Sequence, residues 1–167
     1  NVAIGGNSVL SSLTSGASNV AIARGAGQTI TTTSNTILIG ADAGNVLNGT
    51  TPNGSIAIGV LALQVHTGGP NIAIGYAAMN DTNAGSNSLA SANNIFIGYD
   101  AGGGTWTDAE SSYNVGIGNY VMDSALAGSI QNVAIGHYAL SSVTTSDYNV
   151  AVGANSAYAL TTGGSNV

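Results

Sequence analysis

A short pattern of five residues recurs along the whole chain and restricts the folds that are open to it. Its full form, Asn-Val-Ala-Ile-Gly, occupies 1–5 and returns with small changes eight more times. Successive copies, with a tenth beginning at 166–167, lie 16 to 23 residues apart. Helical repeats need more than about 30 residues, so this period predicts one coil of a β-solenoid per copy. The nine cores are 2–5, 20–23, 37–40, 56–59, 72–75, 95–98, 115–118, 133–136 and 150–153.

Within each core the side chains alternate between two kinds. The first and third residues are Val or Ile in every copy, and side chains two apart on a strand share a face. We expect this β-branched face to be buried. The residue between them is mostly small, so we expect it to face outward against a sister subunit, with Leu38 and Phe96 as exceptions that must find room. The alanines expected in subunit packing are Ala3, Ala21, Ala57, Ala73, Ala134 and Ala151.

The positions that flank each core complete the coil. The fourth core residue is Gly in all copies but one, where Ala23 replaces it, which indicates a positive φ or a close backbone approach. Asn usually precedes the core, where it suits a turn and can form amide ladders between coils. A later apolar pair, as in 78–79 and 139–140, predicts a second, shorter strand. The chain is thus predicted to be all-β, a parallel β-solenoid of about nine coils. We expect 1–167 to be a single repeat array from a longer fibre.

The composition excludes several classes of partner. Lys and Arg together number one in a chain with a formal net charge of −6. Binding to phosphate needs clustered basic residues, so we expect neither nucleic acid nor an anionic membrane surface as a partner. No apolar run approaches the roughly 18 residues of a membrane span, so we expect no membrane insertion by this segment. Cysteine is absent, which excludes disulfides and thiolate metal sites.

The repeat resembles two known groups of fibrous proteins. The stretch 132–140, Asn-Val-Ala-Ile-Gly-His-Tyr-Ala-Leu, is similar to repeats of phage and phage-like tail fibres. The Asn-Val-Ala-Ile-Gly core also resembles the head repeats of trimeric autotransporter adhesins, the group typified by the Yersinia adhesin. Both likenesses cover essentially the whole chain. They imply a left-handed parallel β-roll, assembled as a homotrimer and displayed for attachment. The repeat is longer and more variable here than in the adhesin heads, so both groups remain open.

No residue pattern indicates catalysis, and we expect no enzyme and no cofactor. The glycines at 102–104 lack the Lys that follows a phosphate-binding loop. Asp42 and Asp100 share a column, but three coils would separate them by about 14 Å, whereas a glycosidase needs roughly 5–10 Å. His66 and His137 have no partner at ligand spacing, so only a trimer axis that gathers three copies of one His would bind a metal. We expect both histidines to be packed or solvated.

One interruption of the repeat is a candidate recognition site. The excursion over 102–113 holds a large aromatic residue and two acids, and long loops on a rigid scaffold commonly carry binding. We hypothesise that it binds a cell-surface glycan or a protein receptor. The alternative is that its Trp covers the neighbouring coil or a subunit seam. The hypothesised ligand-binding residues are Trp106, Asp108, Glu110 and Tyr99.

Tyrosines also recur just after the core Gly. Tyr76 and Tyr99 follow it directly, as His137 does, and Tyr120 and Tyr138 come one position later. We predict a packing ladder between coils in preference to a binding stripe.

The leading functional hypothesis is a structural and adhesive fibre segment. It would be a rigid homotrimeric shaft or head, extracellular at a cell surface or in a virion tail fibre. A self-polymerising extracellular filament and, less favoured, a polysaccharide-degrading tailspike are the alternatives.

Overall fold

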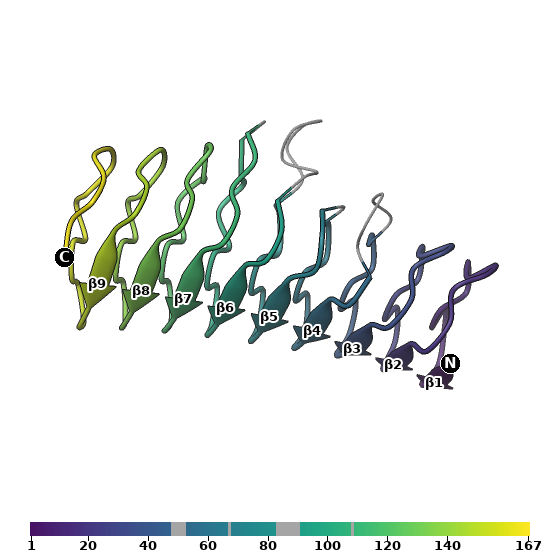
Figure 1. Ribbon diagram of the computed structural model, residues 1–167. Helices are drawn as coiled ribbons and strands as arrows, with labels where there is room; N and C mark the ends of the chain where they lie inside the picture. Colours follow the sequence, from purple (N-terminus) through teal and green to yellow (C-terminus); the bar gives the residue numbers. More distant parts are fainter. Residues whose placement is uncertain (48–52, 67, 83–90, 108) are drawn as a thin grey trace.

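Nine strands of three residues form one parallel sheet in chain order (Figure 1). The computed structural model describes residues 1–47, 53–66, 68–82, 91–107 and 109–167. Every strand coincides with the first three residues of a predicted core. Each pairs in register with the next, so equivalent residues of all copies lie in straight columns. The strands are β1 (Val2–Ile4), β2 (Val20–Ile22), β3 (Ile37–Ile39), β4 (Ile56–Ile58), β5 (Ile72–Ile74), β6 (Ile95–Ile97), β7 (Val115–Ile117), β8 (Val133–Ile135) and β9 (Val150–Val152).

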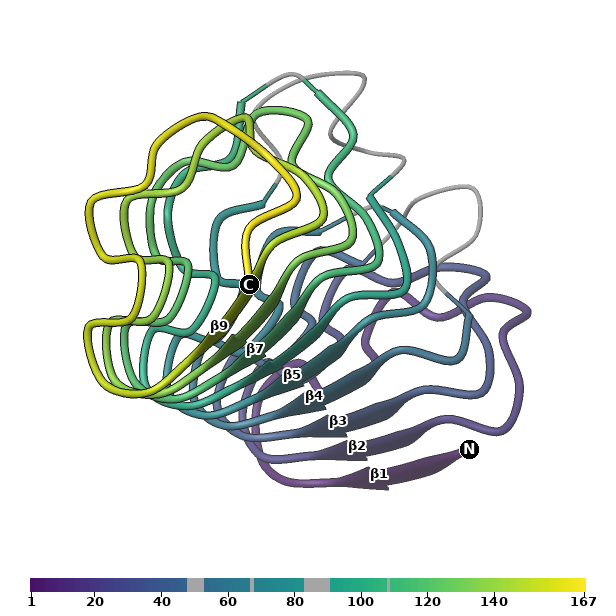
Figure 2. The ribbon, with the colours of Figure 1, turned by 60° about the vertical axis from the view of Figure 1, so that its left-hand side comes forward.

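The chain between two strands leaves the sheet, runs around a loop and returns one position along (Figure 2). The two termini therefore lie at opposite ends of the stack. Nine strands joined by such turns confirm the predicted parallel β-solenoid, and the described residues contain no helix.

The two faces of the sheet are oriented opposite to the prediction. The small middle residue points into the coil, so that Ala57 and Ala73 are 0% exposed within a single chain. The β-branched residues point outward instead. The prediction that the alanines pack against a sister subunit is therefore wrong. Ala21 and Ala134 are likewise 0% exposed and Ala151 is 3% exposed, while Ala3 is exposed because it lies in the end coil.

Large side chains from the returning turn explain this orientation. Leu63, Met79, Met122 and Leu140 lie four residues past the core Gly and are fully buried. They fill the coil opposite the strand, so only a methyl group fits between. The apolar pairs that contain these residues are therefore part of the hydrophobic core. However, the prediction that they form a second strand is wrong, because Met79 and its equivalents have left-handed backbone in a turn.

Leu38 and Phe96 find room because the facing residue in their own coils is Gly. Gly44 and Gly102 occupy the position that holds Leu or Met in the coils of β4, β5, β7 and β8. A Cβ on Gly102 would lie 2.8 Å from the Phe96 ring, and one on Gly44 would lie 2.6 Å from Leu38. In these two coils the large side chain is on the strand and the small residue is in the turn, so the interior is still filled.

The repeated Gly at the end of each strand is required for both predicted reasons. Gly75 has φ of 137°, and a Cβ there would meet the carbonyl oxygen of Gly98 in the next coil. Ala23, the exception, adopts φ of 98°. A side chain at this column would push neighbouring coils apart.

The predicted amide ladder is present along one side of the stack. The side-chain oxygen of each Asn accepts the backbone N–H and one side-chain N–H of the Asn one coil later, as between Asn94 and Asn114 at 2.9 and 3.2 Å. These amides, apart from the exposed Asn166 in the end coil, are buried and satisfied, so they align the coils without an unpaired polar group. The continuous ladder comprises Asn71, Asn94, Asn114, Asn132, Asn149 and Asn166.

Candidate functional site

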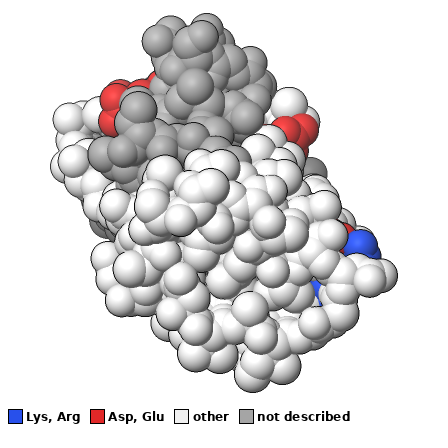
Figure 3. Space-filling model, turned by 90° about the vertical axis from the view of Figure 1, so that its right-hand side faces the viewer, with Lys and Arg blue, Asp and Glu red and all other residues white. Residues whose placement is uncertain are grey.

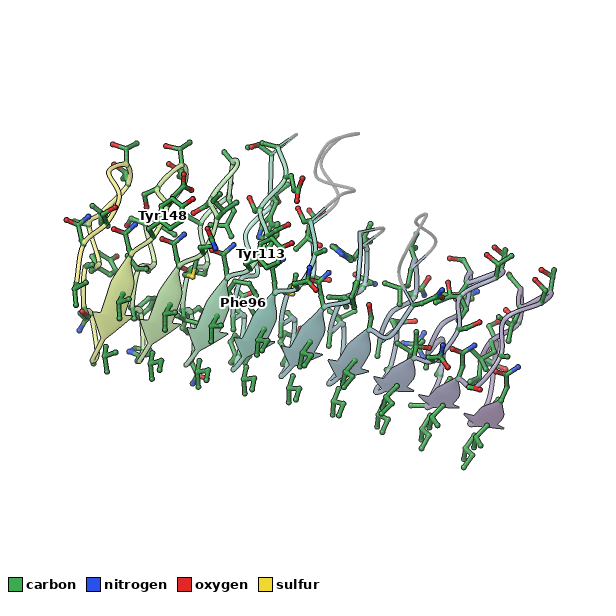
Figure 4. The ribbon with its side chains drawn as sticks, viewed as in Figure 1. Phe96, Tyr113 and Tyr148 are labelled. Carbon is green, nitrogen blue, oxygen red and sulfur yellow. The ribbon has the colours of Figure 1, made fainter. Side chains whose placement is uncertain are left out.

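The outer face of the sheet is the surface that the fold builds most regularly. We define the outer face as the first and third residues of the nine strands, all of them Val or Ile. In-register pairing aligns them in two parallel columns, whose side chains project from the underside of the strands in Figure 4. Eight spacings of about 4.8 Å make each column about 38 Å long.

A large part of this apolar face is open to solvent. Ile117 and Ile135 are each 39% exposed, and Val152 in the end coil reaches 66%. Ile37 is 37% exposed, and the remaining members on β2 to β8 are half-buried. Soluble chains rarely expose contiguous apolar patches larger than a few hundred Å², and such patches mark interaction sites.

Charge is absent from the outer face and sparse elsewhere. No residue of any strand is ionisable. Arg24 and Asp42 form an ion pair at 2.9 Å in the turns after β2 and β3. The view onto the N-terminal end in Figure 3 is mostly neutral, with isolated charged groups. Without nucleophile, acid or base, the outer face can bind an apolar partner but cannot carry out acid–base chemistry.

Trp106 does not form the hypothesised ligand site. Its ring is 0% exposed, its Nε1–H donates to the Gly102 carbonyl at 3.0 Å, and it meets Phe96 edge-on at 6.1 Å between ring centroids. Trp106 is therefore a core residue, as in the alternative interpretation, and its recognition role is wrong. Figure 4 labels Phe96, the ring that it packs on.

The other three hypothesised residues do not join it. Asp108 lies outside the described residues. Glu110 is exposed and accepts a hydrogen bond from the Ser112 hydroxyl at 2.9 Å. Tyr99 is 44% exposed and belongs to a row of tyrosines along the stack. A buried Trp and an exposed Tyr cannot close around one ligand.

The tyrosine row is a packing ladder, as predicted. Tyr76 and Tyr99 stack at 5.0 Å, Tyr99 and Tyr120 approach to 5.3 Å, and Tyr120 and Tyr138 stack at 5.1 Å. Because adjacent rings cover one another, few ring faces remain for a ligand. Tyr158, at 5.9 Å from Tyr138, extends the row from a different column that the repeat pattern does not mark.

The acids do not form a hydrolytic pair along their shared column. Asp42 is engaged by Arg24, three strands away from Asp100. Burial, and then the charge of Asp123, raise the pKa of Asp100. Asp123 in turn accepts the Ser141 hydroxyl at 2.6 Å. Nothing in the repeat marks Asp123 as a neighbour of Asp100, since it lies in another column.

The histidines are packed or exposed, as expected. His137 is exposed beside Tyr138 at 4.2 Å, whereas His66 is fully buried. No group of three metal-ligating side chains occurs in the part of the chain that the structure describes. The surface of that part has no pocket either.

Two exposed tyrosines stand just before the Asn of the ladder. Tyr113 and Tyr148 are 57% and 54% exposed and have φ of 62° and 59° (Figure 4). Equivalent positions hold residues such as Ser18, Asn35 and Gln131. Left-handed backbone is unusual for Tyr, and the column pattern alone does not predict aromatic side chains there.

No protein-family model, curated protein or solved structure matches this chain. Among the described residues, no helix is long and apolar enough to cross a membrane. The outer face, built by all nine strands, is therefore the candidate site on structural grounds alone.

Proposed function

We propose that this chain is a segment of a structural and adhesive fibre. It is a stiff β-solenoid that associates laterally with copies of itself, as a homotrimer, at a cell surface or on a virion. The observation that carries the proposal is the outer face, two unbroken columns of Val and Ile with no charge among them.

A second copy of this chain fits the outer face better than an unrelated partner does. The face is straight, about 38 Å long and apolar throughout, so its complement must share these properties. The outer face of another copy does. Covering it stabilises the assembly by about 25 cal/mol for each Å² of apolar surface removed from water. The number of copies, three, rests on the resemblance to the trimeric fibre repeats.

The adhesive role follows from what a stiff rod can do. The outer face holds the copies together, and the turns and loops on the far side of each coil stay free to meet a glycan or protein receptor. The tyrosine row, in which Tyr76 and Tyr99 are exposed, lies in the turns that directly follow the strands. Extracellular display is proposed from the same resemblance.

The mass of the particle in solution tests the proposal. We expect sedimentation velocity to show three times the chain mass for the wild type. Ile117→Asp should give monomers that keep their β circular dichroism, because a charge then lies in the interface. Val60→Asp is the matched control: Val60 is 43% exposed, close to the 39% of Ile117, but lies in the turn after β4.

Other particle sizes contradict the proposal in distinct ways. A monomeric wild type, or an Ile117→Asp variant that assembles normally, excludes the outer face as an interface. Particles that grow without limit indicate the self-polymerising filament. New reducing ends after incubation with capsular polysaccharide indicate the tailspike.

A further inference from the structure

His66 is the one titratable side chain that is fully buried in the described part of the chain. It lies at the end of the turn between β4 and β5, where its backbone N–H donates to the Val46 carbonyl at 3.0 Å. Both ring nitrogens have side-chain partners, Thr82 at Nδ1 and Asn71 at Nε2, each at 2.7 Å. The imidazole is thus part of the interior polar network.

The Asn71 contact replaces a missing step of the amide ladder. From Asn94 onward, each side-chain N–H₂ donates to the amide oxygen of the Asn one coil earlier. The residue one coil before Asn71 is Ser55, whose hydroxyl accepts the Asn71 backbone N–H at 3.3 Å but which has no amide oxygen. His66 Nε2 supplies the acceptor instead. The ladder of six amides therefore starts on a histidine.

The neighbouring hydrogen bonds assign the tautomer of His66. Asn71 Oδ1 accepts the backbone and side-chain N–H groups of Asn94 at 2.9 and 3.0 Å, which fixes the orientation of the Asn71 amide. Its Nδ2 therefore faces the ring as a donor, also reaching the Gly69 carbonyl at 2.7 Å. It also reaches the Ser91 carbonyl at 3.2 Å. The Thr82 hydroxyl donates to the Val65 carbonyl at 3.4 Å, so its oxygen is an acceptor for a proton on Nδ1, and Nε2 then faces the Asn71 amide as an acceptor.

No carboxylate compensates a charge at this place. Among the described residues, Asp81 is the carboxylate nearest to His66 in sequence, and it pairs with Val65 in a β-bridge beside the Thr82 contact. Its carboxylate accepts the Thr105 hydroxyl at 3.1 Å. The other ionisable side chains in the described parts of these coils follow strands β3, β5 and β6: Asp42, Tyr76, Tyr99, Asp100, Glu110 and Tyr113.

We infer that His66 is an acid-sensitive latch of the solenoid: its protonation removes the acceptor of the first ladder amide and opens the stack between β4 and β5. A proton on Nε2 would place an N–H group against the Asn71 N–H₂. Repulsion between the two donors then favours displacement of His66, because the ladder above holds Asn71 in place, and the Ser91 carbonyl is the acceptor that opposes it.

The sign of the pH dependence follows from burial. Burial lowers the pKa of His66 from 6.5 to about 4, and the smaller opposing effect is a hydrogen bond to the Ser91 carbonyl. Above pH 6.5 the ring is neutral in both the closed and the opened coil. As pH falls from 6.5 toward 4, the opened coil takes up the proton first, so closure loses stability across that window. Between pH 7 and pH 5 opening should rise about twentyfold.

Hydrogen exchange in the whole chain tests the latch. We expect the amides of Asn71 and Asn94, corrected for intrinsic exchange, to lose protection about twentyfold between pH 7 and pH 5. In His66→Gln, whose side-chain oxygen can still accept from Asn71, they should lose less than twofold. His137→Gln, which changes the chain's other histidine on the surface, should behave as wild type. Equal pH dependence in wild type and His66→Gln overturns the inference.

A measurement on the unaltered protein covers the case in which His66→Gln does not fold. Nitrogen NMR of the two imidazoles should show His66 as the Nδ1–H tautomer at pH 7. Its titration should lie near pH 4. An Nε2–H tautomer, or titration of His66 at pH 6.5 or above, overturns the latch. Neither experiment depends on the oligomeric state, so the latch and the proposed fibre function can fail separately.

Discussion

The two faces of the sheet differ in what they contact, although both are apolar. On β5, Ala73 is 0% exposed and meets the turn of its own coil, whereas Ile72 and Ile74 lie half-buried on the outer face. The inner face is small because Met79 already fills the coil opposite it. The outer face is large and β-branched although no part of the same coil covers it.

This contrast shows that residue size reports the space available to a side chain and not its distance from water. A methyl group marks the interior here because the interior is thin. A column of Ile marks the exterior because that surface has room for it, and we attribute its apolar character to a partner. The substitutions below test the two faces separately.

The largest expected effect is that of a charge on the inner face. Ala73→Glu buries a carboxylate with no partner and should lower the free energy of unfolding by about 4 kcal/mol or more, because a buried unpaired ion costs several kcal/mol. We expect loss of the β circular dichroism signal and of the cooperative thermal transition.

Ile74→Glu is the matched change on the outer face, one residue along the same strand. We expect it to keep the circular dichroism spectrum while it weakens association. If Ala73→Glu folds normally and Ile74→Glu unfolds, the assignment of the two faces is reversed.

The second effect concerns how the strand residue and the facing turn residue together fill the interior of one coil. Phe96→Ala leaves a cavity beside Trp106 and should cost about 3–5 kcal/mol in denaturant unfolding, as large-to-small core changes do. Phe96→Ala combined with Gly102→Met re-creates the arrangement of the β5 coil, with Ala73 and Met79. We expect the pair to recover at least half of the loss.

Gly102→Met alone tests whether the new Met stabilises the coil only when Phe96 has been removed. With Phe96 still present, the new side chain overlaps the ring, so this variant should be less stable than wild type by about 1–3 kcal/mol. A stable single variant would show that the inner face has spare volume, which contradicts the account of the alanine column.

The smallest effect is expected at the corner where strand and turn meet. Ala23 has φ of 98° where the other copies have Gly. Ala23→Gly should raise the free energy of unfolding by about 1 kcal/mol, since left-handed backbone costs a non-Gly residue roughly that much. Thermal denaturation would detect this as a higher midpoint, and a lower midpoint would contradict the strain.

The sequence predicts the solenoid well because the repeated residues contact their equivalents in the neighbouring coils. Nine equivalent cores place the strands, and the Gly and Asn columns predict the corner and the amide ladder, since each depends on the same residue one coil away. It does not predict which face is inside. Alternation assigns Ala73 and Ile74 to opposite faces, but their orientation depends on Met79, whose turn has no strand periodicity.

Individual site residues are predicted less well than columns. Trp106 is buried because Gly102 and Phe96 create a place for it, a relation between three residues that no single repeat displays. His66 is likewise understood only through Ser55, which lacks the amide oxygen that the ladder needs. Such exceptions compensate for one another in space, and their spacing in the sequence does not show it.

Thiol labelling tests most directly whether the outer face is covered by another copy. The chain has no Cys, so Ile117→Cys and Val60→Cys each introduce a single reporter. The two native side chains are 39% and 43% exposed in the single chain, so similar maleimide reaction rates are expected if nothing covers them. We predict that Ile117→Cys reacts at least tenfold more slowly than Val60→Cys in the assembled native protein. Equal rates would show that the outer face is open to water and would contradict the proposed interface.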